Sequence, residues 1–221
     1  MDRPAPLAAS YVKDPDAIYR ASFAAIRDTA PIDSLPPDVQ PLALRLIHAS
    51  GMPDLLGDLT YTDDAVRAGH DALAAGKPIL VDATMVAAGI TKRYLPAGNE
   101  VVCTLNHAET PARAKAMSTT RSAAAVDLWR PHLEGAVVAI GNAPTALFRL
   151  LELLEDGAPR PALILGFPVG FVGAAESKEA LIERGGDVPY VALRGRRGGS
   201  AMAAAAVNAL AIDRAKTGAP R

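Results

Sequence analysis

The stretch AVVAIGNAPTALFRLLELLE, residues 136–155, contains the pattern on which the fold prediction depends. Its first five residues form a continuous apolar run, which is typical of a strand covered on both faces. Gly141 and Asn142 suit a tight turn, and Pro144 suits the first turn of a helix. Leucines then recur at helical spacing, at Leu147, Leu150, Leu151 and Leu154. The stretch therefore predicts a strand, a turn and a helix.

Four further apolar runs have the same character, and a fifth is weaker. The four are Pro78–Ala83, Glu100–Leu105, Ala162–Phe167 and Pro189–Leu193, and the weaker candidate is Leu59–Thr62. None of the four alternates cleanly between apolar and polar residues, as a strand with one wet face would. They therefore predict strands of a parallel sheet that is covered on both sides.

Helical patterns separate these runs along the chain. They span Asp16–Thr29, Pro37–Ser50, Ala65–Ala75, Thr110–Leu133 (one or two helices), Pro144–Glu155, Ala174–Arg184 and Gly199–Ile212. Strand–helix alternation favours right-handed βαβ units. The prediction is one α/β domain over residues 1–221, with three layers (α/β/α), a doubly wound parallel five-stranded sheet and an N-terminal helical extension. Residues 213–221 are polar, and we expect them to fray as a tail.

The charges are balanced, with 23 basic and 24 acidic residues among 221 and a formal net charge of −1. Nucleic-acid-binding proteins usually have a basic excess, so no nucleic-acid partner is expected. Cys103 is the only cysteine, which fits a reducing compartment. The first residues lack the apolar core of a signal peptide, and the longest apolar stretch, 201–212, is shorter than the roughly 20 residues that cross a bilayer. We therefore expect a cytoplasmic protein that does not bind a membrane.

Sequence motifs for common cofactors are missing. Gly166, Gly170 and Gly173 lie in a glycine-rich stretch, GFPVGFVGAAESK, but the G-K-[ST] ending of a phosphate loop does not follow. The patterns G-x-G-x-x-G and H-E-x-x-H do not occur, and no Cys/His cluster does either. The sequence therefore predicts neither a nucleotide cofactor nor a metal ion, although so glycine-rich a loop has room for a broad, flat ligand.

Residues that follow the predicted strands are candidates for a ligand site, because open α/β sheets bind ligands beyond the carboxyl ends of their strands. At Gly141 and Asn142 two interpretations stay open: a tight capped turn, or a helix N-terminus directed at a ligand carboxylate. In RGRRGGSAM (194–202), the arginines form either an anion site or a solvated basic turn. Arg121, at an expected helix start, either pairs with a ligand carboxylate or covers a helix face.

A histidine in RLIHASG (45–51) raises a similar question. His48 ends an apolar helix face, and the small residues after it leave space beside the ring. Local composition favours a packed structural histidine. The alternative is a general acid or base beside a cavity, since imidazole titrates near neutral pH. Upstream, Tyr19 and Ser22 share a helix face, with Arg27 nearby.

Eight collinear segments, which together cover nearly the whole chain, resemble the precorrin-8X methylmutase family of cobalamin biosynthesis. They are IYRASFAAIR (18–27), RLIHASG (45–51), PILVDATMVAAGIT (78–91), LPAGNEVVCTL (95–105), TRSAAA (120–125), VVAIGNAPTALFRLLE (137–152), ALILGFPVGFVGAAESKEAL (162–181) and RGRRGGSAMAAAAVNAL (194–210). The sequence departs from the family pattern at Ser50, where a Cys is common, and at Val81 and Thr84, where Cys and Glu are expected.

The resemblance implies a flavodoxin-like fold and an isomerase that moves a methyl group from C11 to C12 of precorrin-8X, giving hydrogenobyrinate. It assigns the general acid to His48, whose imidazolium donates a proton or hydrogen bond to a ring nitrogen. It also implies a tetrapyrrole polycarboxylate substrate, no cofactor or metal, and a homodimer with its active site near the subunit interface. The substrate-binding positions that it suggests are Tyr19, Ser22, Arg27, Thr91, Arg121, Gly141, Asn142, Gly166 and Gly170.

Three alternatives to that function stay open. The chain could bind or channel a corrinoid without catalysis. It could be the version of the isomerase that acts on cobalt-precorrin-8. A generic flavodoxin-like regulatory domain is the third alternative, although no acidic phospho-acceptor cluster supports it.

Overall fold

The computed structural model describes residues 11–212; residues 1–10 and 213–221, which include the predicted tail, lie outside the described part. One sheet has the strand order β1-β6-β5-β4-β2-β3. Five of its strands are parallel: β2 (Ile79–Val81), β3 (Val101–Val102), β4 (Val137–Ile140), β5 (Leu163–Gly166) and β6 (Tyr190–Leu193). The five predicted strands are thus confirmed. Numbered among themselves, they have the order 2-1-3-4-5 of flavodoxin-like folds.

The weaker candidate adds a sixth strand at the edge of the sheet. β1 (Leu59–Tyr61) pairs antiparallel with β6, with Leu59 opposite Leu193 and Tyr61 opposite Val191. Its residues are only half-buried, because an edge strand has one neighbour and less cover. The sheet is therefore mixed, with an antiparallel edge that the prediction of a purely parallel, five-stranded sheet did not include.

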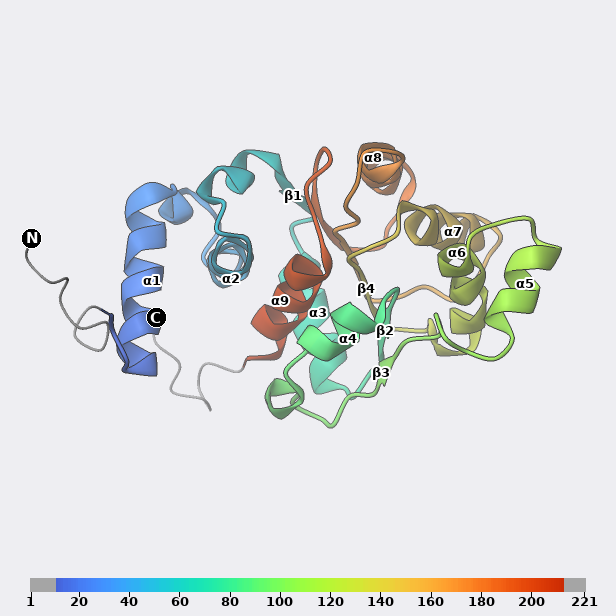
Figure 1. Cartoon of the computed structure of the whole chain (residues 1–221), viewed down its shortest axis with the longest axis horizontal. Helices are drawn as coiled ribbons and strands as arrows, with labels where there is room; N and C mark the ends of the chain where they lie inside the picture. The colour runs from blue at the N-terminus through green and yellow to red at the C-terminus, as the bar shows by residue number, and fades with distance from the viewer. Residues whose placement is uncertain (1–10, 213–221) are drawn as a thin grey trace, which may run out of the picture.

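Alternate residues of each strand enter two separate cores, one on each face of the sheet. Val137 and Ala139 of β4 belong to one core, and Val138 and Ile140 belong to the other. The first core includes α3 (Ala65–Ala74) and α9 (Ser200–Ala211), and the second includes α7 (Pro144–Glu155) and α8 (Ala174–Arg184). Figure 1 shows these pairs of helices on the two sides of the strands, in the predicted three-layer arrangement.

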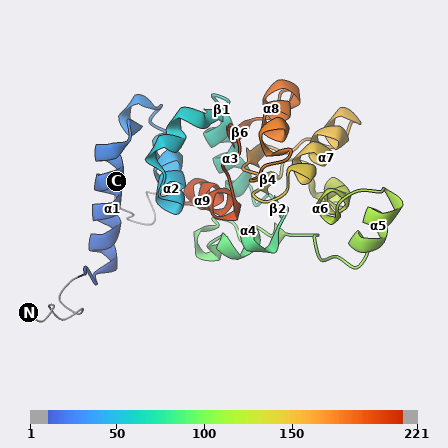
Figure 2. The same ribbon diagram turned by 45° about the horizontal axis from the view of Figure 1, so that its top comes forward.

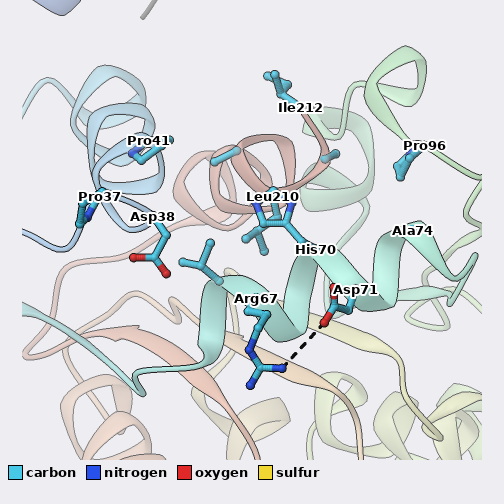
Figure 3. A pocket seen from close by; sticks show the side chains of 13 residues that line it. Pro37, Asp38, Pro41, Arg67, His70, Asp71, Ala74, Pro96, Leu210 and Ile212 are labelled. Carbon is cyan, nitrogen blue, oxygen red and sulfur yellow. Dashed lines mark ion pairs between the residues drawn. The ribbon is translucent and has the colours of Figure 1, made fainter. Parts of the chain in front are cut away.

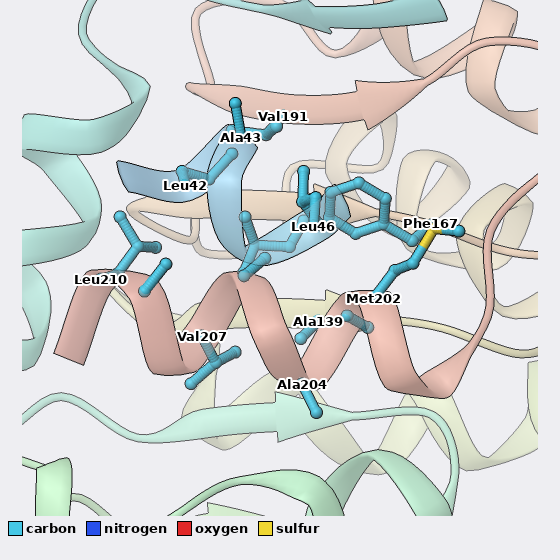
Figure 4. Packing of buried hydrophobic residues seen from close by; sticks show 14 of the residues in the cluster. Leu42, Ala43, Leu46, Ala139, Phe167, Val191, Met202, Ala204, Val207 and Leu210 are labelled. Atoms are coloured by element: carbon cyan, nitrogen blue, oxygen red, sulfur yellow. The ribbon is translucent and has the colours of Figure 1, made fainter. Parts of the chain in front are cut away.

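The N-terminal helices α1 (Pro15–Thr29) and α2 (Gln40–Ser50) form the predicted extension. α2 packs on α9 and α1 packs on α2, so α1 lies at the periphery of the molecule (Figures 1 and 2). Leu42, Ala43 and Leu46 of α2 lie against α9 in the first core (Figure 4). α2 ends at Gly51, whose φ of +69° gives the left-handed cap that glycine adopts without strain.

Some shorter elements differ from the prediction. α4 (Thr84–Gly89) follows β2 and is too short for a helical period to be visible in the sequence. Residues 110–133 contain α5 (Thr110–Ala116), α6 (Arg121–Val126) and a 3-10 turn, Asp127–His132. Further 3-10 turns span Ile32–Ser34, Pro53–Asp58 and Lys92–Tyr94. Within residues 11–212, no helix has the length and apolarity needed to cross a membrane.

The alanine-rich helix α9 is approached very closely by its neighbours. A Cβ built on Gly89 of α4 would lie 2.7 Å from Cβ of Ala204, closer than two carbons can pack. A Cβ on Gly141, in the turn after β4, would lie 2.8 Å from Cβ of Ala203. Glycine facing alanine therefore sets the separation of these segments.

We expect Gly89→Ala to lower the free energy of unfolding by about 1–3 kcal/mol, because the new methyl group overpacks the α4–α9 contact. Gly57→Ala is the matched control, since no atom lies within 4 Å of the added Cβ there. Urea unfolding of both variants measures the difference. Equal stabilities for the two would show that the α4–α9 contact relaxes freely.

Candidate functional site

His48 lies on the last turn of α2 and is exposed, so it is not part of the packed core. Its ring stacks on Tyr19 of α1, with centroids 5.4 Å apart and planes inclined by 26°. Phe23 meets it edge-on, at 5.6 Å and 88°. The two aromatic rings restrain the imidazole while leaving it accessible. This arrangement fits the acid–base interpretation better than the structural one.

A groove of about 290 Å³ opens beside His48. Tyr19, Arg45 and His48 lie on its α1–α2 side, and Gly89 contributes from α4. The opposite wall is a face of α9, formed by Ala201, Ala204, Ala205 and Asn208. Because α4 and α9 begin where β2 and β6 end, the groove lies toward the carboxyl ends of the strands, where this class of sheet binds ligands.

Asn208 joins α9 to the α4 segment and was not predicted. Its Oδ1 accepts the backbone N–H of Thr91 at 2.8 Å, and its Nδ2 donates to the carbonyl oxygen of Gly89 at 2.9 Å. The structure thereby places Thr91, a predicted site residue, next to the groove. A polar residue inside the apolar run AMAAAAVNALAI was the available signal for Asn208.

A second missed residue, Asp82, binds the turn between β4 and α7. Its carboxylate is 2% exposed and accepts three backbone N–H groups, from Gly141 at 2.9 Å, Asn142 at 3.0 Å and Ala143 at 2.7 Å. Burial raises the pKa of Asp82, and the three hydrogen bonds oppose that rise. The backbone N–H groups of the turn before α7, where the sequence offered a site for a ligand carboxylate, therefore bind a carboxylate of the protein itself. An aspartate directly after an apolar strand was the signal for it.

The other predicted side chains are only partly brought together. Ser22 and Arg27 lie further along α1 and do not line the groove, and Arg27 pairs with Asp33 at 3.0 Å. Arg121 begins α6, which packs in the core on the other face of the sheet, and its guanidinium donates to Asn106 Oδ1 at 2.9 Å. Within one chain, Arg121 is thus remote from His48.

The two predicted glycines at the end of β5 and in the loop after it have different environments. Gly166 is buried, and a Cβ there would lie 2.7 Å from Leu181 Cδ2, so packing requires this glycine. Gly170 has a φ of +149°, which side-chain-bearing residues rarely adopt, and lies in the loop after β5. Next to it, Phe171 and Val172 are 86% and 89% exposed. The loop therefore presents apolar side chains to its surroundings at a strand's carboxyl end.

The largest described cavity, about 640 Å³, lies elsewhere, between α2, α3 and α9 (Figure 3). Its lining includes His70, Ala74 and Ile212, near the end of α3 that leads into the start of β2. It therefore lies toward the amino ends of the strands, where ligand sites of such sheets are not expected. Among residues 11–212, no group of three or more His, Cys, Asp or Glu side chains is arranged to hold a metal ion.

The fold and groove together define a flavodoxin-like α/β protein with an accessible histidine beside a groove that is lined partly by alanines. The family model for precorrin-8X methylmutase matches residues 17–212. The chain is 62% identical over 204 residues to a precorrin-8X methylmutase of Pseudomonas aeruginosa, covering 92% of this chain and 98% of that protein. A cobalt-precorrin-8 methylmutase of Priestia megaterium is 35% identical over 199 residues, 90% of this chain and 88% of that one.

A solved structure gives the same result. The precorrin-8x methyl mutase of Thermus thermophilus superposes with a TM-score of 0.81 at 44% identity, over 88% of this chain and 94% of that one. The chain belongs to the precorrin-8X methylmutase family. The resemblance stated from the sequence is confirmed, as are the flavodoxin-like architecture and the class of enzyme, an isomerase of cobalamin biosynthesis.

We expect Asp82→Asn to destabilise the protein by about 1–3 kcal/mol near neutral pH, because an amide group cannot accept all three backbone N–H groups. The pKa of Asp82 is raised by folding, so the folded state binds a proton more tightly than the unfolded state does. The stability that Asp82 contributes should therefore increase as pH falls from neutral through the raised pKa. Unfolding free energies of wild type and Asp82→Asn, measured from pH 7 down to about pH 4, near the ordinary pKa of an aspartate, should diverge. Convergence on acidification would contradict this assignment.

Proposed function

We propose that this chain converts precorrin-8X to hydrogenobyrinate by moving a methyl group from C11 to C12, with His48 as the acid. The observation that carries the proposal is an accessible imidazole, oriented by two aromatic rings, in a groove at the carboxyl ends of the strands. An imidazolium there donates a proton or hydrogen bond to a ring nitrogen of the tetrapyrrole. Stabilising the charge that develops during migration lowers the barrier.

The groove walls suit a flat, polycarboxylate ring. Alanines 201, 204 and 205 of α9 form a low wall along which a macrocycle can lie. Arg45 supplies a positive charge at the same groove, and its guanidinium lies 5.9 Å from the Phe23 ring centroid, near His48. We propose Arg45 as a carboxylate ligand in addition to the predicted Tyr19.

The other predicted substrate-binding residues differ in how well their positions fit contact with the substrate. Thr91 borders the groove through Asn208, whereas Arg27 would have to exchange Asp33 for a substrate carboxylate. Ser22 lies on α1 between Tyr19 and Arg27. For Asn142 the exposed side chain is the part free to bind, because its backbone N–H bonds to Asp82. Contacts with Gly141, Gly166 and Gly170 would be made by backbone atoms, and the first two are buried.

A homodimer would account for two further features. Phe171 and Val172 are large apolar side chains that stay exposed in one chain, as is Met85 of α4 at 64%. Arg121 is remote from His48 within one chain, and a second copy could supply it to the groove. We therefore propose a homodimer that acts in the cytoplasm, with a tetrapyrrole substrate and no cofactor or metal of its own.

Metal-free precorrin-8X is the favoured substrate. The chain is 62% identical to a relative named precorrin-8X methylmutase and 35% identical to one named cobalt-precorrin-8 methylmutase. The more similar relative carries the metal-free name, and this supports the metal-free reaction.

His48→Ala should lower kcat by roughly 100- to 10,000-fold, the range for removal of a general acid, while substrate binding is largely kept. The conversion is followed by the change in tetrapyrrole absorption, and binding by spectral titration. His70→Ala is the matched control, because His70 is exposed but lines the larger cavity. A His48→Ala protein with full turnover would exclude the acid role, and a wild type that binds pigment without converting it would favour the carrier alternative.

Incubation with metal-free and cobalt-containing substrate in parallel tests the choice of substrate. We expect a spectral change with precorrin-8X and a much slower one with cobalt-precorrin-8. Conversion of the cobalt form alone would assign the chain to the cobalt-dependent route.

A further inference from the structure

Lys178 of α8 is a charged residue in the protein interior, with 0% exposure. Its Nζ donates to the carbonyl oxygen of Arg197 at 2.7 Å, and no carboxylate of residues 11–212 forms an ion pair with it. Burial lowers the pKa of Lys178 to about 8, although Asp58 and Glu179 act in the opposite direction. A buried ammonium without an ion-pair partner costs folding free energy. Stability therefore does not explain why this position carries a lysine.

The carbonyl group that Lys178 holds lies where two strand-end loops meet. The N–H of Gly170, in the loop after β5, donates to Arg196 O at 3.2 Å, and the N–H of Gly199 donates to Phe167 O at 2.8 Å. A Cβ on Gly198 would lie 2.3 Å from Phe167 O, so the two backbones are in direct contact. Lys178 adds a third link, because it lies on α8, which follows the loop after β5, and bonds to the backbone of the loop after β6.

The side chain of Arg197 links the loop after β6 to the segment that follows His48 in the chain. Its guanidinium pairs with Asp54 at 2.7 Å and also with Asp58, both in the 3-10 turn Pro53–Asp58 that comes after α2. The backbone N–H of Arg194 donates to Asp58 O at 2.8 Å. Together with Met52, the two loops line a second groove of about 270 Å³ at the carboxyl ends of β5 and β6.

We propose that Lys178 is a positioning residue for the isomerase: by holding the Arg197 carbonyl, it sets the loops after β5 and β6 against the start of α9 and the turn behind His48. The inference rests on the proposed function, because it takes these loops as part of the substrate-binding surface. α9 begins at Ser200, three residues after Arg197, and its next residue, Ala201, lines the His48 groove. Displacement of Arg197 would therefore shift the start of α9, which forms the groove wall against which the tetrapyrrole is proposed to lie. Lys178 itself lines neither groove and reaches the second one only through the Arg197 carbonyl.

The test compares Lys178→Met with wild type in KM, kcat and thermal midpoint. Methionine fills similar space without a donor, so we expect KM to rise roughly tenfold, the effect of losing a hydrogen bond from a charged group. kcat should change much less, because His48 is untouched. The thermal midpoint should stay level or rise, because an uncompensated buried charge is removed. Lys178→Gln keeps an N–H donor on a shorter side chain, and its KM should lie between the other two.

Lys77→Met is the matched control, because the Lys77 Nζ also donates to a backbone carbonyl, that of Glu134 at 3.3 Å, but before β2 begins. It should leave KM unchanged. An unchanged KM for Lys178→Met, or a parallel loss of activity and thermal midpoint, would overturn the positioning role while leaving the proposed function intact. A Lys178→Met protein that does not fold overturns it as well, because the lysine is then structural. If wild type does not convert precorrin-8X, or His48→Ala does so fully, the proposed function fails and this inference falls with it.

Discussion

The close packing around α9 is the constraint on which the rest of the structure depends. Its alanines and the glycines that face them bring α4, the β4–α7 turn and the helical extension within reach of one helix. The extension carries His48, so the position of the imidazole depends on a helix that makes its main contact with α9. Asn208 of α9 then binds the end of the α4 segment, because its amide group accepts from the Thr91 N–H and donates to the Gly89 carbonyl oxygen. The groove beside His48 is thus the space left between elements whose spacing small residues determine.

Two buried ionisable side chains, Asp82 and Lys178, bind the backbone of loops in this chain. Asp82 accepts hydrogen bonds from three backbone N–H groups of the turn between β4 and α7. Lys178 satisfies a carbonyl oxygen between two loops. In both cases an ionisable side chain is buried and hydrogen-bonded to the backbone of a turn or loop at the carboxyl end of the sheet. Such groups cost free energy to bury and gain it back in part from their hydrogen bonds, so they specify geometry more than they add stability.

The choice of the His48 groove as the proposed site rests on topology rather than on cavity size. The larger cavity lies toward the amino ends of the strands, whereas the His48 groove is smaller. In a doubly wound sheet the loops at the carboxyl ends diverge and leave room for a ligand, whereas the opposite ends are joined by packed connections. The face of α9 that lines the groove carries the small side chains Ala201, Ala204 and Ala205, which suits the flat substrate proposed above.

The sequence by itself determined the five parallel strands, the two core faces and the family, because apolar runs and collinear motifs are local properties of the chain. It also placed His48 beside small residues, but local composition favoured a packed histidine. Only the tertiary structure decided that the ring is exposed and backed by Tyr19 and Phe23, since α1 and α2 meet through contacts that no spacing rule encodes. It likewise decided that the backbone donors of Gly141 and Asn142 belong to Asp82, about sixty residues earlier, and that Arg121 lies across the sheet. Hydrogen-bond partners distant in sequence depend on how the strands are ordered, and a linear pattern does not contain that order.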